Sequence, residues 1–170
     1  MGRSFVLAGL ALLVACGGGG GGGTVTPPPA SGNARLAADA VEIGSAATVA
    51  DVTVQLASAP AEGACLLQVA VELPPELTLP ANDRLQAAQP LPTLDGDFAA
   101  GRFVVLCGDA QNVAAANLAL GPLFRLRLTP ASPRQPGTYT VRFVGLKAST
   151  RDGTAVPADT NPTVVSVIVR

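Results

Sequence analysis

The stretch from Ala64 to Leu73 constrains the fold of this chain more than any other, because its side chains alternate strictly in character. One side of the stretch is wholly apolar and the other is mixed. The apolar side consists of Cys65, Leu67, Val69, Val71 and Leu73, and the mixed side of Leu66, Gln68, Ala70 and Glu72. Successive side chains of a β-strand point to opposite faces, so this period of two residues predicts a strand with one buried face.

A second stretch, Gly101–Gly108, alternates in the same way and suits the first as a partner. Its apolar side consists of Phe103, Val105 and Cys107. An antiparallel pairing with Cys65 opposite Cys107 makes every facing pair apolar, which favours pairing on a buried sheet face. The pairs are then Cys65–Cys107, Leu67–Val105 and Val69–Phe103. We therefore predict that the two strands are neighbours in one sheet and that their thiols face each other.

Short alternating runs recur along the rest of the chain, separated by Pro, Gly and Asp. The runs are Arg35–Ala38, Ala47–Leu56, Leu77–Leu79, Leu123–Leu128, Tyr139–Phe143 and Val164–Val169. No long stretch has the 3.6-residue period of a helix, although the segment 109–120 could form a short helix or a loop. This spacing indicates an all-β fold: a two-sheet antiparallel β-sandwich, jelly-roll-like, with about nine strands over residues 34–170.

Composition excludes one class of partner. Hydrophobic residues make up 48% of the 170 residues and charged residues only 14%, so the core is easy to fill and the surface is lightly charged. The net charge is -1, and Lys147 is the only lysine. Nucleic acid is held by concentrated basic patches, which this chain lacks. We therefore expect no nucleic-acid partner.

The amino terminus has the build of a signal peptide. Arg3 supplies a positive charge, and Phe5–Ala15 is an apolar run interrupted only by Gly9. The run is shorter than the roughly 20 residues that a membrane span needs, but it suits a signal-peptide core. It ends in Leu13-Val14-Ala15-Cys16, which resembles the lipobox of bacterial lipoproteins.

The lipobox resemblance implies that residues 1–15 are removed and that Cys16 becomes the first mature residue, lipidated on its thiol and acylated on its amine. Several acyl chains hold a protein at a bilayer far more firmly than one. Gly17, in place of Asp, resembles outer-membrane sorting in Gram-negative lipoproteins. We therefore expect an exported, lipid-anchored protein of the cell envelope, at the outer membrane. The alternative is an ordinary secretory signal cut nearby, with Cys16 incidental.

Residues 16–33 predict a disordered tether between the lipid and the folded domain. Gly17–Gly23 is a run of glycines, and three prolines, Pro27–Pro29, follow it. Glycine makes a chain flexible, and consecutive prolines favour an extended polyproline geometry. A phosphate-binding loop would need a strand before the glycines and Lys-Ser/Thr after them, and neither is present.

If Cys16 carries lipid, Cys65 and Cys107 are the two cysteines left in an oxidising compartment. We predict a disulfide between them, which would close a loop of about 40 residues and stabilise the fold by roughly 4 kcal/mol. The alternative is two buried thiols. Both positions are core-facing, and the chain has no histidine to activate a thiol.

The order of several weak motifs resembles that of cohesin domains and their relatives among the carbohydrate-binding modules. In chain order the motifs are Gly63, Pro74-Pro75-Glu76-Leu77, Gly101, Gly121-Pro122-Leu123-Phe124, Pro136-Gly137-Thr138-Tyr139 and Asp152-Gly153. The resemblance covers nearly all of residues 34–169 and implies a sandwich in which the Cys65 and Phe103 strands are neighbours. Two features depart from it: Glu72-Leu73 stands where cohesins have Tyr-Asp, and the cysteine pair is not general in cohesins.

Catalytic and cofactor chemistry find little support in the sequence, so we predict no catalytic residue and no cofactor. The absence of histidine excludes serine–histidine chemistry. Asp95-Gly96-Asp97 is first of all a turn signal. Its alternatives are a calcium site, which needs six or more oxygen ligands, and an acid–base pair.

The mixed side of the two organising strands predicts a surface for a protein partner. Its residues are Leu66, Gln68, Ala70, Arg102, Val104 and Leu106. An apolar centre with a polar rim is typical of such surfaces, and in cohesins this sheet face receives the dockerin. The alternatives are that Pro80–Ala100 or the segment after Asp109 covers the face, or that the patch is accidental. Carbohydrate is the other ligand class, disfavoured because only Phe98 among the aromatic residues we assigned could be exposed.

Overall fold

The computed structural model describes residues 32–110 and 117–170, and every described element is a strand. The twelve strands are β1 Arg35–Ala38, β2 Val41–Ile43, β3 Ala50–Ser58, β4 Leu66–Glu72, β5 Leu77–Thr78, β6 Leu85–Ala87, β7 Thr93–Ala99, β8 Arg102–Gly108, β9 Gly121–Pro130, β10 Gly137–Ser149, β11 Ala155–Val156 and β12 Thr163–Val169. Within these ranges no helix is long and apolar enough to cross a membrane.

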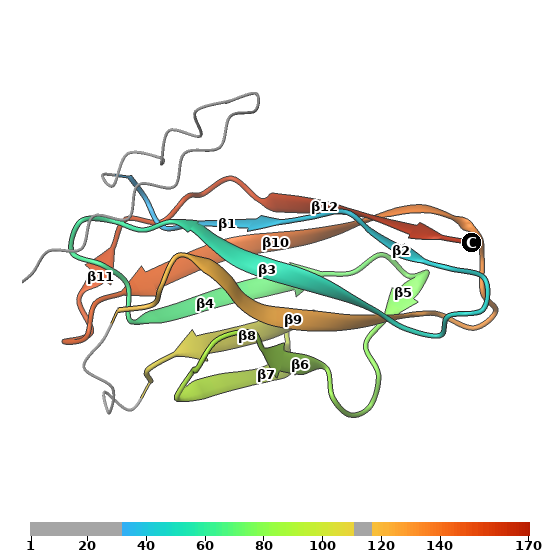
Figure 1. Cartoon of the computed structure of the whole chain (residues 1–170), viewed down its shortest axis with the longest axis horizontal. Coiled ribbons are helices and arrows are strands. Elements are labelled where there is room, and N and C mark those ends of the chain that lie inside the picture. The colour runs from blue at the N-terminus through green and yellow to red at the C-terminus, as the bar shows by residue number, and fades with distance from the viewer. Residues whose placement is uncertain (1–31, 111–116) are drawn as a thin grey trace, which may run out of the picture.

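The strands form two sheets that pack face to face (Figure 1). The smaller sheet has the order β1-β3-β9-β5, with β6 also paired to β9. The larger sheet has the order β2-β12-β10-β4-β8-β7, with β11 paired to β10. The named strands pair antiparallel except for β2, which runs parallel to β12. The predicted all-β, two-sheet sandwich is confirmed.

The core lies between the sheets and is built from the apolar side of each alternating run. The largest fully buried side chains are Phe103, Phe124, Ile43, Leu56, Leu67, Leu123, Leu126, Leu128, Val52, Val54, Val69 and Val71. Burying each Val, Leu or Phe side chain contributes about 1.5–3 kcal/mol to folding. The period of two in the sequence therefore becomes a continuous layer of buried side chains, and the intervening residues face outward.

The strands that the sequence missed are short or lie at sheet edges. They are β2, β6, β7 and β11, which together with the eight alternating runs found in the sequence make twelve strands, against about nine predicted. Three of them have only two or three residues, too few to show a periodic pattern. The fourth, β7, has seven residues.

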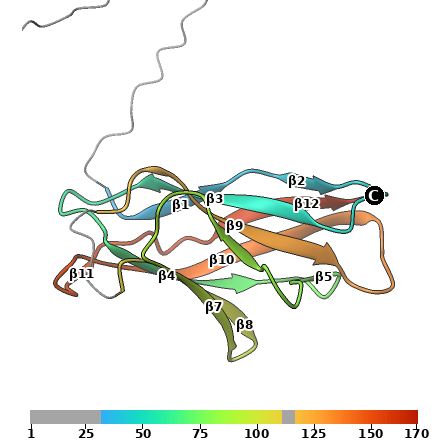
Figure 2. The same ribbon diagram turned by 60° about the horizontal axis from the view of Figure 1, so that its bottom comes forward.

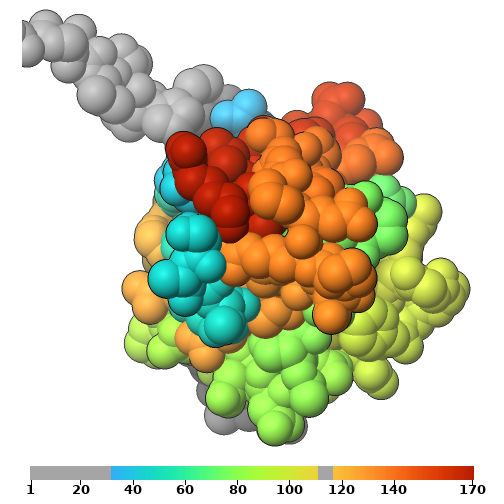
Figure 3. Space-filling view, turned by 90° about the vertical axis from the view of Figure 1, so that its right-hand side faces the viewer, coloured from blue at the N-terminus to red at the C-terminus, as the bar shows by residue number. Residues whose placement is uncertain are grey.

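The prediction of a turn at Asp95-Gly96-Asp97 is wrong, because these residues lie inside β7. The chain reverses instead at Ala100 and Gly101, whose φ angles are 50° and 78°. Two consecutive positive φ values define a type I′ turn, which matches the twist of a β-hairpin. The resulting β7–β8 hairpin stands out from the body of the sandwich (Figures 2 and 3).

The predicted pairing of β4 with β8 is confirmed, but its register is wrong by two residues. Leu67 lies opposite Cys107, Val69 opposite Val105 and Val71 opposite Phe103. Cys65 precedes β4, and its carbonyl accepts a hydrogen bond from the amide of Asp109 at 2.8 Å. Cys65 and Cys107 are therefore diagonal rather than facing. A shift of two residues keeps every apolar side chain on the same face, so both registers satisfy the apolar pattern.

The predicted disulfide is not formed in the structure: no bridge joins Cys65 to Cys107, and both are buried. Diagonal neighbours on adjacent strands lie about 7–8 Å apart, whereas bridged cysteines need Cα atoms within about 7 Å. The diagonal placement thus explains why the bridge is absent. The Sγ of Cys65 donates instead to Oδ1 of Asn117 at 3.2 Å.

Candidate functional site

The outer face of the larger sheet, meaning the side turned away from the core, gathers all six residues predicted to bind a partner. Leu66, Gln68 and Ala70 come from β4, and Arg102, Val104 and Leu106 come from β8. The register places Gln68 opposite Leu106 and Ala70 opposite Val104. The apolar members are half-buried, and Gln68 and Arg102 are exposed. Because inward-facing and outward-facing side chains alternate along β4 and β8, these six residues form one contiguous patch.

The described strands from Pro80–Ala100 do not lie over this outer face. β6 pairs with β9 in the smaller sheet, and β7 continues the larger sheet edge to edge beyond β8. This segment therefore widens both sheets, and the idea that its strands cover the face is wrong. The other covering segment, after Asp109, lies mostly outside the described residues.

Strand β10 adds further side chains on the other flank of β4. Val144 lies opposite Ala70, and Lys147 lies opposite Gln68. The register shifts between Val144 and Lys147, where Gly145 has a φ of 63°. A glycine with positive φ suits a β-bulge, which inserts an extra residue and restores the alternation beyond it. The bulge brings Lys147 onto the outer face.

Glu72 holds two arginines at one margin of the outer face. Its carboxylate accepts from Arg102 at 2.8 Å and from Arg142 at 3.2 Å. Asp95 and Asp97 of β7, opposite Leu106 and Val104, flank the apolar centre on the other side. On β4, β7, β8 and β10 the outward-facing cations are Arg102, Arg142 and Lys147, and the outward-facing carboxylates are Glu72, Asp95 and Asp97. With three charges of each sign, the rim is balanced, so apolar contact rather than net charge dominates the surface.

Two shallow hollows lie on the outer face, one on each side of the Gln68–Leu106 pair. One hollow of about 190 Å³ also contacts Leu66, Lys147 and Ala155. The other, of about 290 Å³, is lined by Asp95, Asp97, Phe98, Ala99 and Val104 as well. Gln68 and Leu106 lie between the two hollows, which are shallower than a usual small-ligand cavity.

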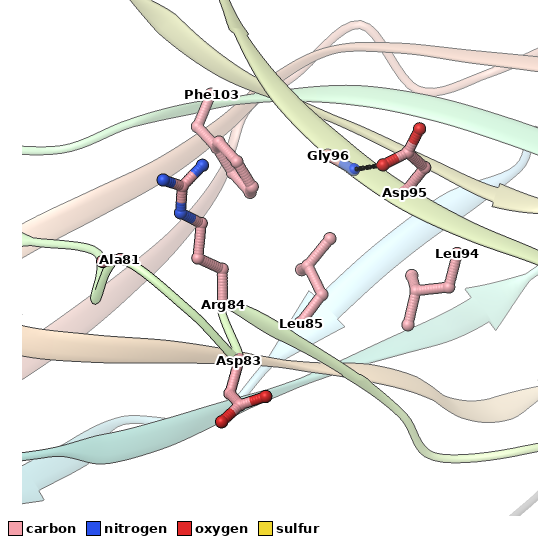
Figure 4. A pocket seen from close by; sticks show the side chains of 8 residues that line it. All are labelled: Ala81, Asp83, Arg84, Leu85, Leu94, Asp95, Gly96 and Phe103. Carbon is pink, nitrogen blue, oxygen red and sulfur yellow. Dashed lines mark hydrogen bonds between the residues drawn. The ribbon is translucent and has the colours of Figure 1, made fainter.

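A third hollow, of about 350 Å³, opens between β6 and β7 on the core side of the hairpin (Figure 4). Leu85, Leu94 and Phe103 line it, and Arg84 and Asp83 lie at its rim. The Arg84 guanidinium carbon lies 5.5 Å from the ring centroid of Phe98 and 5.9 Å from that of Phe103. The two rings also contact each other, with centroids 5.2 Å apart.

Phe98 is exposed, as predicted, with 53% of its surface accessible. Arg84 lies over one face of the ring by cation–π attraction, and Phe103 packs against it at a tilt of 58°. A sugar needs a free aromatic face on which to stack. The neighbours of Phe98 occupy part of the surface that a sugar would use.

The structure also bears on the metal-site alternative and on the cysteines. In residues 32–110 and 117–170 no group of three or more acidic, cysteine or histidine side chains is arranged to hold a metal ion. Burial raises the pKa of Cys107 to about 12, so this thiol stays protonated at neutral pH. Cys16 lies outside the described residues, as do the tether up to residue 31 and the predicted signal peptide.

Sequence reasoning missed the contributions of β7 and β10 to the outer face. The alternation of Tyr139, Val141 and Phe143 already indicated that Arg142 and Val144 face outward. Nothing local showed that β10 lies beside β4, because strand order depends on contacts far apart in the sequence. The bulge at Gly145 was equally hidden.

No family model matches the chain, and no curated protein matches it. Solved structures do. The sixth cohesin of Acetivibrio cellulolyticus scaffoldin B, in complex with a Cel5 dockerin, is 16% identical with a TM-score of 0.64, covering 82% of this chain and 100% of that one. A type I cohesin–dockerin complex of Clostridium thermocellum is 12% identical with a TM-score of 0.65 and the same coverage. The chain has the cohesin fold.

A cohesin described as non-cellulosomal is also similar to this chain. A non-cellulosomal cohesin of the archaeon Archaeoglobus fulgidus is 14% identical, with a TM-score of 0.56, and covers 81% of this chain and 92% of that one. At such low sequence identities, the similarity shows a shared fold and nothing further. The predicted cohesin-like domain is supported at that level.

Proposed function

We propose that this chain is a lipid-anchored module of the cell envelope that binds a protein partner through the outer face of β4, β8 and β10. The observation that carries the proposal is the outer face itself. It combines a half-buried apolar centre with a rim of balanced charge, and the described strands leave it uncovered. The partner would be dockerin-like or another protein that presents an apolar surface of matching shape.

Two further observations support a protein rather than a small-molecule ligand. The hollows on the outer face are shallow and separated by Leu106 and Gln68. Protein interfaces combine an apolar centre with a polar rim, and a few central residues carry most of their binding energy. Among the solved structures of this fold, several are complexes of a cohesin with a dockerin.

The test is binding by a Leu106→Asp variant. Leu106 borders both hollows and is only half-buried, so a carboxylate there should leave the fold intact. The expected result is a loss of about 30-fold or more in affinity for the partner, the scale of a central interface residue. Val49→Asp is the matched control, since Val49 is exposed beside the smaller sheet and gains the same charge. Partner candidates are dockerin-like sequences encoded in the same genome.

The two variants together show whether the outer face is the binding surface. If Leu106→Asp loses the partner and Val49→Asp keeps it, the outer face is the binding surface. If both variants bind as the native chain does, the outer face is not the binding surface. A glycan array with the same proteins tests the carbohydrate alternative: binding there that is insensitive to Leu106→Asp would replace this proposal.

The lipid anchor is tested separately by Cys16→Ser. The native chain should fractionate with membranes and yield an acylated amino-terminal peptide in mass spectrometry. The variant should yield no acylated amino-terminal peptide, because its position 16 has no thiol to carry lipid. Native protein found in the soluble fraction with an unmodified Cys16 would remove the anchor from the proposal without affecting the binding surface.

A further inference from the structure

Strand β7 forms the long free edge of the larger sheet. It is the last strand in the sheet order, and on its far side the described residues place no strand. Four of its seven residues, Asp95, Asp97, Phe98 and Ala99, are exposed, and the hairpin projects from the sandwich (Figure 2). An exposed edge presents unpaired backbone groups and is a template for pairing with another chain. Proteins that keep such an edge unpaired protect it with local features of the strand.

The hairpin turn determines which backbone groups of β7 face outward. In a two-residue type I′ hairpin the flanking residues, here Ala99 and Arg102, form a hydrogen-bonded pair. Pairs alternate along the ladder, so Asp97 and Asp95 also bond to β8. The amides of Phe98 and Gly96 must then point away from β8, toward the open edge.

Both of these outward amides are already occupied. Gly96 donates its N–H to Oδ1 of Asp95 at 2.8 Å, as Figure 4 shows, and Phe98 donates its N–H to Oδ1 of Asp97 at 2.7 Å. In each case the acceptor belongs to the preceding residue. An incoming strand needs these two donors, and each carboxylate that holds one also repels the carbonyl oxygens of such a strand.

Gly96 cannot protect the edge with a side chain of its own. A Cβ at this position would lie 2.5 Å from Cζ of Phe103 and 2.8 Å from Cδ1 of Leu85. The close packing of Phe103 therefore requires glycine, and glycine leaves the backbone bare in an exposed strand. Protection has to come from the neighbours, and the carboxylates of Asp95 and Asp97 supply it.

We infer that Asp95 and Asp97 are edge-blocking residues, which cap two outward amides of β7, those of Gly96 and Phe98, and prevent β7 from pairing with β7 of a second copy. The sequence Asp-Gly-Asp is thus neither a turn nor a metal site here. The inference does not depend on what the outer face binds. It implies that a partner meets this side of the domain through side chains rather than by adding a strand.

The test is self-association of the full chain in a non-associating detergent, measured by analytical ultracentrifugation over a range of concentrations. The double variant Asp95→Ala/Asp97→Ala uncovers both amides and should self-associate at least about tenfold more tightly than the native chain. The control Asp39→Ala/Glu62→Ala removes two exposed carboxylates elsewhere and the same total charge. It should behave like the native chain.

A second variant separates capping from charge repulsion. Asp95→Asn/Asp97→Asn removes the charge but keeps an amide oxygen that can accept the same hydrogen bond. Under the capping proposal it self-associates clearly less than the alanine variant. Equal association of the two variants would mean that charge alone blocks the edge, and the capping proposal would fail.

Hydrogen exchange distinguishes edge pairing from other aggregation. In the associated alanine variant, the amides of Gly96 and Phe98 should exchange more slowly than in its dilute, monomeric form, while far-UV circular dichroism remains that of a β-protein. Association without such protection, or an alanine variant that stays monomeric at every concentration, would overturn the inference.

Discussion

The centre of the larger sheet and its edge strand β7 satisfy the same physical demands by different means. In the centre, β4 has a partner strand on each side, so its backbone groups are paired by neighbours and its inner side chains are buried. At the edge, β7 has one partner, its residues are mostly exposed, and two of its amides bond to aspartates of the same strand. Packing therefore governs the centre, and local polar contacts govern the edge.

The sharpest way to test this difference is to truncate two phenylalanines that contact each other. Phe103 is 1% exposed and Phe98 is 53% exposed. Phe103→Ala should lower the free energy of unfolding by about 3–5 kcal/mol, because it leaves a cavity between the sheets. Phe98→Ala should lower it by about 1 kcal/mol, the scale of a lost aromatic pair. Urea unfolding followed by far-UV circular dichroism measures both, since the chain has no tryptophan. Similar losses for the two variants would contradict the distinction between centre and edge.

A smaller effect is expected where centre and edge meet, at Gly96. Gly96→Ala places a methyl group against the Phe103 ring, which is buried and cannot move away easily. The free energy of unfolding should fall by about 1–3 kcal/mol, as for other overpacked sites. Gly44→Ala is the control, because nothing lies within 4 Å of its added methyl. If Gly96→Ala is as stable as Gly44→Ala, the hairpin is free to shift outward and is not held by the core.

The thiol of Cys107 offers a pH test of burial in the centre. Its pKa is raised from 9.0 to about 12 by desolvation, so the folded state keeps a proton that the unfolded state releases above pH 9. The stability from this group is complete below pH 9 and is lost as the pH rises toward 12, by up to about 1.4 kcal/mol per pH unit. Urea unfolding at pH 8, 9 and 10 should show a steeper decline for the native chain than for Cys107→Ala. Equal slopes would show that the Cys107 thiol ionises alike in both states.

The sequence could predict the centre of the sheet because burial imposes a pattern. The alternation of Leu67, Val69 and Val71 identified the inner face and the neighbouring strand. Register was not predictable in the same way, because sliding β8 by two residues keeps Val105 and Cys107 inside. Burial alone does not distinguish the two registers. The assumption that the two thiols face each other selected the wrong one.

The edge could not be predicted from local preference. Asp95-Gly96-Asp97 has the composition of a turn, yet pairing with β8 holds it extended. The real turn uses Ala100 with a φ of 50°, a conformation that alanine rarely adopts and that no local signal indicated. The outward-facing positions on β4 and β8 were predictable from the alternation of side chains along each strand. The outward position of Lys147 was not, because it depends on the bulge in β10. Tertiary contacts overrode local propensity at Asp95-Gly96-Asp97 and at Ala100.

The smallest effect is expected at Glu72, which lies at the margin between the centre and the outer face. Its ion pairs with Arg102 and Arg142 are half exposed, so solvent screens them, and Glu72→Gln should change the free energy of unfolding by less than about 1 kcal/mol. The difference between native chain and variant should shrink further as the salt concentration rises, because exposed charges are screened within about 10 Å at 0.1 M salt. Urea unfolding in low and high salt measures this. A large, salt-independent loss would mean that the two arginines are held in place for packing rather than by charge, and the rim of the outer face would then belong to the centre of the sheet.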